Sequence, residues 1–253
     1  MEHITSSKSP QIAFSVSQRL HDQLGQIIAA TKPGERLPSE PALAEKLGVS
    51  RATLREGMRT FETQGMIRRR QGSGTYVNQP PQVLETGLEV LESIESIAER
   101  SGLSVEMGEL NVQYRKAKHD ECESLELDPC KDVVQVSRVI YAEHRAVAYL
   151  IDILPSNILD PEELKNGFNG SILDLLLQRG QPDLYISRTE INAVPATSQV
   201  ARALFIQRGD VLLCFTANLF STTGQIVDHS YSYFLPGYFR FHVVRRVGLG
   251  EGL

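Results

Sequence analysis

The first strong pattern along the chain is helical. Apolar residues recur every three or four positions through VSQRLHDQLGQIIA, at Val16, Leu20, Leu24, Ile27 and Ile28. This spacing places them on one face and predicts an amphipathic helix. The segment KPGERLPSE that follows contains a proline and a glycine, which end a helical pattern.

Two further helices are predicted close behind the first. Ser39 is a candidate N-cap for EPALAEKL, Pro41 is tolerated in the first turn, and Gly48 permits the turn that follows. Ser50 can cap a third helix that runs to about Gln64 and stops at the next glycine. A helix of about eight residues, a glycine-containing turn and a longer helix predict a helix-turn-helix.

The third predicted helix carries two stripes of different chemistry. Its apolar stripe consists of Leu54, Met58 and Phe61. Arginines at four-residue intervals in SRATLREGMR form the second stripe, about a quarter turn away. Arg51 and Arg55 lie at the N-terminal end, which in a recognition helix reaches base edges, and guanidinium groups suit guanine O6 and N7. The alternative is a solvated face with local salt bridges, such as Arg59 with Glu62.

The segment MIRRRQGSGTYV favours nucleic-acid binding over that alternative. It predicts a strand, a basic turn and a return strand, which together form a β-hairpin wing. Gly72 and Gly74 let the backbone come close to phosphates or enter a minor groove, with Arg70 and Gln71 at the tip. We therefore predict a winged helix-turn-helix domain over residues 12–77.

Beyond this domain the pattern changes. Residues 88–102 have helical spacing and a glycine stop, whereas the later segments alternate apolar and polar residues as strands do. The predicted strands are VEMGELNVQY, DVVQVSRVIYA, AVAYLIDILP, LYISRTEINAV, DVLLCFTANLF and QIVDHSYSYFLP. The short helices PEELKN, SILDLLLQRG and TSQVARALF interrupt them. An α+β domain built on an antiparallel sheet is predicted over residues 83–248.

Two hairpins in this second domain echo one another. DVVQVSRVIYAEHRAVAYLIDILP and DVLLCFTANLFSTTGQIVDHSYSYFLP each contain an apolar strand, a polar turn, an apolar strand and Leu-Pro. Chance similarity and internal pseudo-symmetry both remain open. Pseudo-symmetry would place a cleft between the two hairpins.

Charge divides the chain in the same way. The net charge of the 253 residues is -5, yet residues 32–79 hold nine basic and five acidic side chains, and residues 80–253 carry -9. Such asymmetry is expected of a module that binds a polyanion and is attached to a domain that does not. The sequence NQPPQ, residues 78–82, joins two prolines to polar residues and predicts a short linker.

Composition argues against several other classes of protein. Three cysteines, an odd number, disfavour a disulfide framework, and no apolar run reaches the length of a membrane span. The N-terminus lacks a secretory pattern, so we expect a cytoplasmic chain. His119, Cys122 and Cys130 have metal-like spacing without a recognisable fourth ligand, and we predict neither metal nor cofactor.

The segment PGERLPSEPALAEKLGVSRATLREGMRTFETQGMIRRRQGSGTYV resembles the DNA-binding domain of the GntR family of bacterial transcription regulators. The resemblance covers about 65 residues and implies DNA contacts from the recognition helix and the wing. Pro41 departs from the arginine that is usual in the family, so the operator is expected to differ. The candidate DNA-binding residues are Arg36, Ser50, Arg51, Thr53, Arg55, Arg70, Gln71, Gly72, Ser73 and Gly74.

The second domain resembles the UTRA effector domain of the HutC branch, which has a chorismate-lyase-like fold. The resemblance is carried by Arg138 before YAEHRAV, by GSILDLL, by EINAVPATSQVARAL and by GQIVDHSYSYFLPGYFRF. It implies an effector site with Arg138, Tyr149, Ser171, Asp228 and Tyr231 as candidate residues. Ile140 replaces a second arginine that is common there, which favours a carboxylate or less charged ligand over a sugar phosphate. Arg138 could instead form a structural salt bridge, Ser171 a plain N-cap, and the two tyrosines could be core residues.

These features predict a homodimeric transcription regulator, most simply a repressor, that binds a pseudo-palindromic double-stranded DNA operator and releases it on binding a small polar or anionic effector. No catalytic triad, Walker loop or metal-binding helix signature is present in the sequence, so we predict no enzymatic activity. Two alternatives remain: an architectural DNA-binding protein without an effector, and a lyase-like enzyme suggested only by fold analogy.

Overall fold

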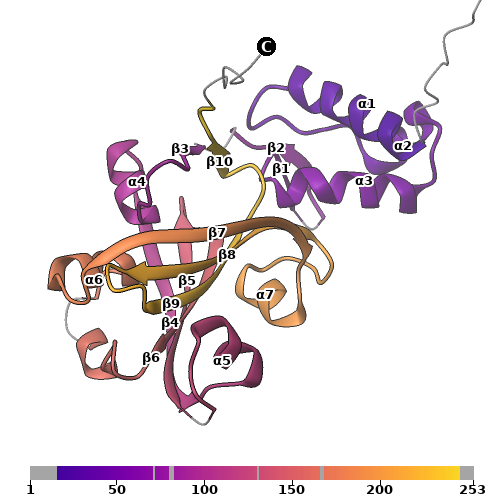
Figure 1. Cartoon of the computed structure of the whole chain (residues 1–253). Coiled ribbons are helices and arrows are strands. Elements are labelled where there is room, and N and C mark those ends of the chain that lie inside the picture. The colour runs from indigo at the N-terminus through magenta and orange to yellow at the C-terminus, as the bar shows by residue number, and fades with distance from the viewer. Residues whose placement is uncertain (1–15, 71, 80–82, 130, 166–167, 246–253) are drawn as a thin grey trace, which may run out of the picture. The chain divides into compact units, whose positions relative to one another are not determined.

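The computed structural model describes residues 16–70, 72–79, 83–129, 131–165 and 168–245 (Figure 1). The chain forms two compact units, residues 1–81 and 82–253. Within the described residues, no helix is long and apolar enough to cross a membrane.

The first unit contains three helices and a two-stranded antiparallel hairpin. Its elements are α1 (Val16–Ala30), α2 (Glu40–Leu47), α3 (Arg51–Thr63), β1 (Ile67–Arg70) and β2 (Gly74–Val77). One apolar cluster joins the helices to the hairpin: Leu20, Leu24, Ile28, Leu37, Leu43, Leu54, Met58, Phe61, Ile67 and Val77. The winged helix-turn-helix architecture predicted from the sequence is confirmed.

Local hydrogen bonds define where α2 and α3 begin. Ser39 Oγ accepts a hydrogen bond from the Ala42 amide at 3.5 Å, and Ser50 Oγ accepts one from the Thr53 amide at 3.1 Å. Each hydroxyl satisfies an amide that has no partner within its helix. Between the helices, Gly48 has φ +65°, a left-handed conformation that favours glycine. These three residues set the angle at which α3 follows α2.

The second unit is an α+β domain, as predicted. Its strands are β3 (Leu84–Gly87), β4 (Val105–Lys116), β5 (Asp132–Ala142), β6 (Arg145–Pro155), β7 (Leu184–Pro195), β8 (Val211–Ser221), β9 (Ile226–Phe234) and β10 (Phe239–His242). Its helices are α4 (Ile94–Arg100), α5 (His119–Leu125), the 3-10 turn η1 (Pro161–Leu164), α6 (Ile172–Arg179) and α7 (Ser198–Ala203). Six strands form one antiparallel sheet in the order β4-β5-β6-β9-β8-β7.

The sheet is built from two copies of one topology. The order β4-α5-β5-β6 is repeated as β7-α7-β8-β9, and the two halves meet where β6 pairs with β9. The echoing hairpins of the sequence are β5-β6 and β8-β9, so they occupy equivalent places in the two halves. This arrangement is the internal pseudo-symmetry that the sequence left open.

The two faces of the sheet are packed by different helices. On one face, α6 contributes Ile172 and Leu176 to a cluster with Val134, Val136 and Leu154. On the other face, α5 contributes Leu125, which packs with Val133 and Ile153, and α7 contributes Val200, which lies in a cluster with Tyr149. Because neighbouring residues of a strand point to opposite faces, this assignment fixes the side on which each strand residue lies.

The prediction of a helix over residues 88–102 is wrong for its first half. The helix is α4, and Ser93 Oγ caps it by accepting a hydrogen bond from the Ser96 amide at 3.0 Å. Residues 84–87, just before the predicted helix, form β3, which pairs in parallel with β10, and the Leu88 amide extends this ladder to the His242 carbonyl at 2.9 Å. Residues 89–93 are in neither a helix nor a strand.

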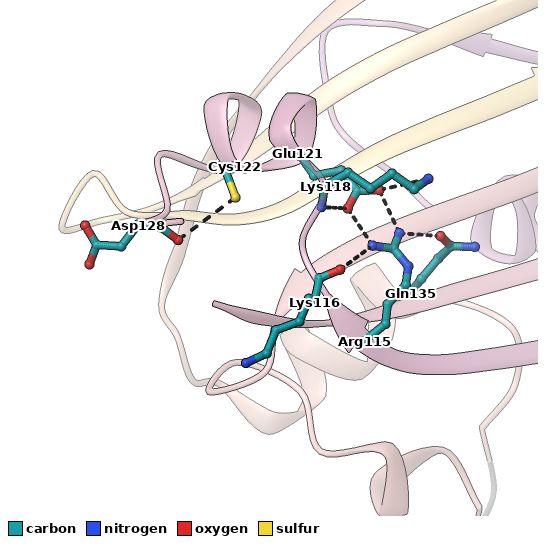
Figure 2. A network of polar contacts seen from close by, with 7 residues as sticks. All are labelled: Arg115, Lys116, Lys118, Glu121, Cys122, Asp128 and Gln135. Atoms are coloured by element: carbon teal, nitrogen blue, oxygen red, sulfur yellow. Dashed lines mark hydrogen bonds and ion pairs between the residues drawn. The ribbon is translucent and has the colours of Figure 1, made fainter. Parts of the chain in front are cut away.

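A buried ion pair fixes α5, a helix that the sequence pattern did not reveal. Arg115 donates two hydrogen bonds to the Glu121 carboxylate and one to Gln135 Oε1, each at 2.6 Å (Figure 2). The Lys118 amide donates to Glu121 Oε2 at 2.9 Å, so the same carboxylate caps the helix (Figure 2). Burial raises the pKa of Glu121, but the hydrogen bonds from Arg115 and Lys118 and the charges of these residues together outweigh it and lower the pKa to about 2.

Candidate functional site

The exposed side of α3 carries the polar residues that the sequence singled out. Leu54 is buried in the core, whereas Arg51, Thr53 and Arg55 are exposed in the first two turns. Ser50 Oγ bonds Thr53 Oγ1 at 2.8 Å as well as the Thr53 amide, which fixes the start of the helix. The helix therefore presents two guanidinium groups and a hydroxyl from its N-terminal end.

Arg55 is oriented by neighbours on two other elements. Its Nε donates a hydrogen bond to Glu40 Oε2 at 2.7 Å, although 64 % of the side chain remains exposed. Arg69 of β1 donates to the Arg55 carbonyl at 3.2 Å and pairs with Glu62 at 3.4 Å. Arg59 forms an ion pair with Glu56 at 3.5 Å and is only partly exposed. Arg51 and Arg55 are thus the outward cations of this helix, and Arg69 ties the helix to the wing.

The wing holds a further set of exposed groups. The Arg70 guanidinium lies over the Tyr76 ring, 5.0 Å from its centroid, and Ser73 Oγ hydrogen-bonds the Tyr76 hydroxyl at 2.7 Å. Gly72 has φ +74° and open space where a side chain would stand. Gln71 lies outside the described residues. A glycine tip with a stacked arginine beside it allows close approach of a phosphate backbone.

Arg36 reaches the wing from the segment before α2. The Leu37 amide donates to the Thr75 carbonyl at 2.8 Å, which holds this segment along β2. The Arg36 guanidinium then lies directly over Gly74, at a place where any side chain would collide with it. The structure thereby brings Arg36 to the same hairpin as Ser73 and Gly74. Whether any of these residues contacts DNA stays a prediction.

A cavity of about 530 Å³ lies in the second unit. Both halves of the repeat line it, since Arg138 and Asp152 come from β5 and β6 while Phe215 and Asp228 come from β8 and β9. Residues 86–95, including the start of α4, and Ser171 at the start of α6 complete the lining. The volume falls within the range of small-molecule sites.

Arg138 is buried in the wall of this cavity and is already paired. It forms an ion pair with Asp152 and donates a second hydrogen bond from Nε to the Gly170 carbonyl, with only 4 % of the residue exposed. The register explains the pairing: Arg138 lies opposite Leu150, so Asp152, two residues further along β6, shares its face. The structural salt bridge considered for Arg138 from the sequence is therefore present.

Asp228 adds a second carboxyl group beside this pair. It is 6 % exposed, and its Oδ1 accepts a hydrogen bond from the Ile153 amide at 3.2 Å. Burial raises the pKa of Asp228 well above its usual range, and the charge of Asp152 and a hydrogen bond with it add to the rise, while Arg138 opposes it. A protonated Asp228 can donate a hydrogen bond to the Asp152 carboxylate.

Glu95 of α4 supplies a third carboxyl group, which sequence reasoning missed. Its Oε1 is buried and has no hydrogen-bond partner among the described residues. It lies against Gly170, where an added side-chain carbon would be 2.9 Å from Oε1. Burial raises the pKa of Glu95, with Arg138 opposing and the nearby Asp174 and Asp152 adding to the rise. No local signal marks Glu95 or Asp152 in the sequence, because strand pairing and helix packing bring them to Arg138.

The five candidate effector residues do not come together. Arg138, Ser171 and Asp228 line the cavity, and Ser171 is the N-cap of α6, accepting from the Asp174 amide at 3.0 Å. Tyr149 and Tyr231 lie on the opposite face of the sheet. There the Tyr149 hydroxyl accepts a hydrogen bond from Gln199 Nε2 at 3.0 Å, and the Tyr231 hydroxyl bonds His229 Nε2 at the same distance.

The metal-like spacing in the sequence corresponds to no cluster of ligands in the part of the chain that the structure describes. No three His, Cys, Asp or Glu side chains within those residues are grouped to hold a metal ion. His119 pairs with Glu123 at 3.3 Å. Cys122 contacts the Asp128 carbonyl at 4.0 Å (Figure 2). Cys130 lies outside the described residues.

Comparison with known families assigns both units. Residues 16–77 match the bacterial regulatory proteins of the gntR family, and residues 100–240 match the UTRA domain. The two matches follow the division into helix-turn-helix unit and sheet unit.

Relatives match along most of the chain. The HTH-type transcriptional repressor NagR of Bacillus subtilis is 23 % identical over 221 residues, covering 87 % of this chain and 89 % of NagR. The mannosyl-D-glycerate transport/metabolism system repressor MngR of Escherichia coli is 23 % identical over 235 residues, covering 90 % and 93 %. The crystal structure of PhnF from Mycobacterium smegmatis has a TM-score of 0.61 at 19 % identity and covers 90 % of this chain and all of PhnF, which indicates a common fold.

Proposed function

Because this chain belongs to the gntR family of bacterial regulatory proteins and carries a UTRA domain, we propose that it is a repressor that leaves its DNA operator when a small polar effector binds the cavity of the sheet domain. Residues 12–77 bind DNA, residues 78–82 form the linker, and residues 83–248 bind the effector and form the homodimer. Residues 12–15, 80–82 and 246–248 of these ranges lie outside the described residues.

The DNA-binding part of the proposal rests on the exposed side chains of α3 and of the wing. Arg51, Thr53 and Arg55 are exposed on α3, and Arg70 is exposed on the hairpin that follows it. Exposed guanidinium groups at the start of a recognition helix can read guanine in the major groove, while wing residues contact the backbone or minor groove. A homodimer would place two such surfaces on the two halves of a pseudo-palindrome.

The effector-binding part of the proposal rests on the cavity. It is lined by both halves of the sheet and by the N-terminal ends of two helices, so a ligand there contacts four or more elements at once. A ligand that binds one arrangement of these elements better than another shifts the equilibrium between DNA-bound and free dimers. We also propose that the protein acts in the cytoplasm and catalyses no reaction.

Selection of binding sites from random DNA tests this function. The expected product is an inverted repeat that binds at least a thousandfold more tightly than unrelated DNA. A reporter gene whose promoter overlaps that repeat should be expressed less when the protein is present, whereas an activator would raise expression. A bound DNA without symmetry or sequence preference would instead favour the architectural alternative.

A further inference from the structure

The charges of the cavity wall are predominantly acidic. Its carboxyl groups are Glu89, Glu92, Glu95, Asp152 and Asp228, and Arg138 is the cationic side chain among the described lining residues. Glu92 pairs with Arg100 near the exposed rim, and Glu89 accepts a hydrogen bond from the Val244 amide. The inner wall therefore holds three carboxyl groups around one guanidinium group.

Arg138 has little capacity left for an anionic ligand. Its guanidinium already contacts Asp152 and the Gly170 carbonyl. An added anion would have to share this cation with Asp152 and to approach the Glu95 carboxylate as well. In a partly desolvated cavity, repulsion between like charges is strongly unfavourable.

Along β9 the cavity changes from acidic to aromatic. The residues that face it are Asp228, Ser230, Ser232 and Phe234 in order, and Phe234 lies about 20 Å from Asp228 at the usual rise of a strand. Phe215 and Phe241 pack beside Phe234, with ring centroids 5.1 Å and 5.0 Å from it. A ligand here meets carboxyl groups, hydroxyl groups and aromatic rings within one cavity.

From this arrangement we propose that the effector is a cation with an apolar body, a primary amine or guanidinium compound whose charged group lies beside Glu95 and whose apolar part faces Phe215 and Phe234. Glu95 lines the cavity, so its carboxylate can accept a hydrogen bond from the ligand's N–H group. This proposal rests on the proposed function, since it names the class of ligand for the same cavity.

Probes of equal shape and different charge test the class of ligand. We would titrate the full chain, without DNA, with 4-phenylbutylamine, 4-phenyl-1-butanol and 4-phenylbutyrate, and with octylamine and octanoate, using calorimetry. The amines should bind at least tenfold more tightly than the carboxylates of the same skeleton. Tighter binding of the carboxylates, or no binding by either amine, would overturn the proposal.

Two substitutions locate the cation. Glu95→Gln should weaken amine binding at least tenfold and leave the alcohol unaffected, whereas Glu99→Gln, on the exposed side of the same helix, should change neither. Ala217→Trp, which fills the cavity from β8, should abolish binding of all probes and so places them in the cavity. Unchanged binding of the alcohol shows that the Glu95 variant is folded. Equal amine affinity of the Glu95 and Glu99 variants would contradict the proposal.

Binding to the selected operator distinguishes failure of the regulatory function from failure of the cationic-effector proposal. If the protein binds no operator, the regulatory function fails, and amine binding to the cavity is still measured. If an anion binds the cavity and releases the operator, the regulatory function stands and the cationic effector is excluded.

Discussion

Glu40 and Arg55 join the first residue of α2 to the second turn of α3 through a hydrogen bond of 2.7 Å between Glu40 Oε2 and Arg55 Nε. The bond uses one side of the guanidinium group. Its terminal amines can still point away from the protein, since 64 % of the side chain is exposed. Such a contact is worth little for stability but restricts the rotamers from which Arg55 can reach a base.

Arg55→Ala should therefore reduce sequence discrimination. We expect a loss of about 1 to 3 kcal/mol on the selected operator and a much smaller loss on random DNA, because the lost group reads a base edge. Glu40→Gln should act in the same direction and more weakly, since it loosens Arg55 without removing it. Fluorescence anisotropy on both DNAs measures the difference, with Arg208→Ala in the other unit as control. Equal weakening on both DNAs would make Arg55 a phosphate contact.

Arg70→Ala should change the salt dependence of binding. Each phosphate contact adds roughly 0.9 to the slope of log affinity against log salt, so the loss of one contact flattens the slope by about one. Tyr76→Phe keeps the ring under Arg70 and removes only the hydroxyl that bonds Ser73, so it should leave the slope unchanged. A slope that is the same for wild type and Arg70→Ala would remove Arg70 from the DNA contacts.

The sequence predicted those parts of the fold whose signals are local. Ser39 and Ser50 begin their helices through bonds to amides three residues away, and Gly48 adopts the left-handed turn between them. These signals need no distant partner, and the first unit follows them closely. The six strands of the sheet also formed where their patterns predicted them, although β5 and β6 are buried on both faces.

Other features depended on partners that lie far away in the chain. Residues 84–88 pair with β10, so the predicted helix does not begin at Leu88, and Ser93 caps the helix that begins at Ile94. Tyr149 and Arg138 lie on opposite faces of the sheet because Arg138 pairs with Leu150, a register that the sequence alone does not fix. The same register brings Asp152 to Arg138, and the packing of α4 adds Glu95. The acidic character of the cavity thus became visible only in three dimensions.

Asp152→Asn and Asp228→Asn should differ in stability although both remove a buried carboxyl group. Loss of Asp152 leaves the Arg138 guanidinium without its charge partner, so we expect about 3 kcal/mol of destabilisation. Asp228 has a strongly raised pKa, and an amide can replace its protonated form as a donor to Asp152, so the change should stay within about 1 kcal/mol. Urea unfolding followed by circular dichroism, fitted with separate transitions for the two units, tests this. Similar losses for both variants would mean that Asp228 is ionised.

Glu121 should make the sheet domain sensitive to acid. Its pKa is lowered from 4.5 to about 2 in the folded protein. The unfolded chain therefore binds a proton first as pH falls, and the stability that Glu121 contributes above pH 4.5 is lost progressively toward pH 2. Between pH 5 and pH 3 this loss amounts to about 2 kcal/mol.

Glu121→Gln removes this titration, and Arg115→Met shows whether Arg115 lowers the pKa of Glu121. The difference in unfolding free energy between wild type and Glu121→Gln should shrink by that amount from pH 5 to pH 3, as measured by urea unfolding at each pH. Glu123→Gln, on the exposed side of the same helix, is the matched control and should keep the wild-type pH dependence. Arg115→Met should abolish the loss of stability toward acid, because the guanidinium group that holds the Glu121 carboxylate in its charged form is gone and burial then raises its pKa. A difference between wild type and Glu121→Gln that does not vary with pH would show that Glu121 titrates in the folded protein as it does in the unfolded chain.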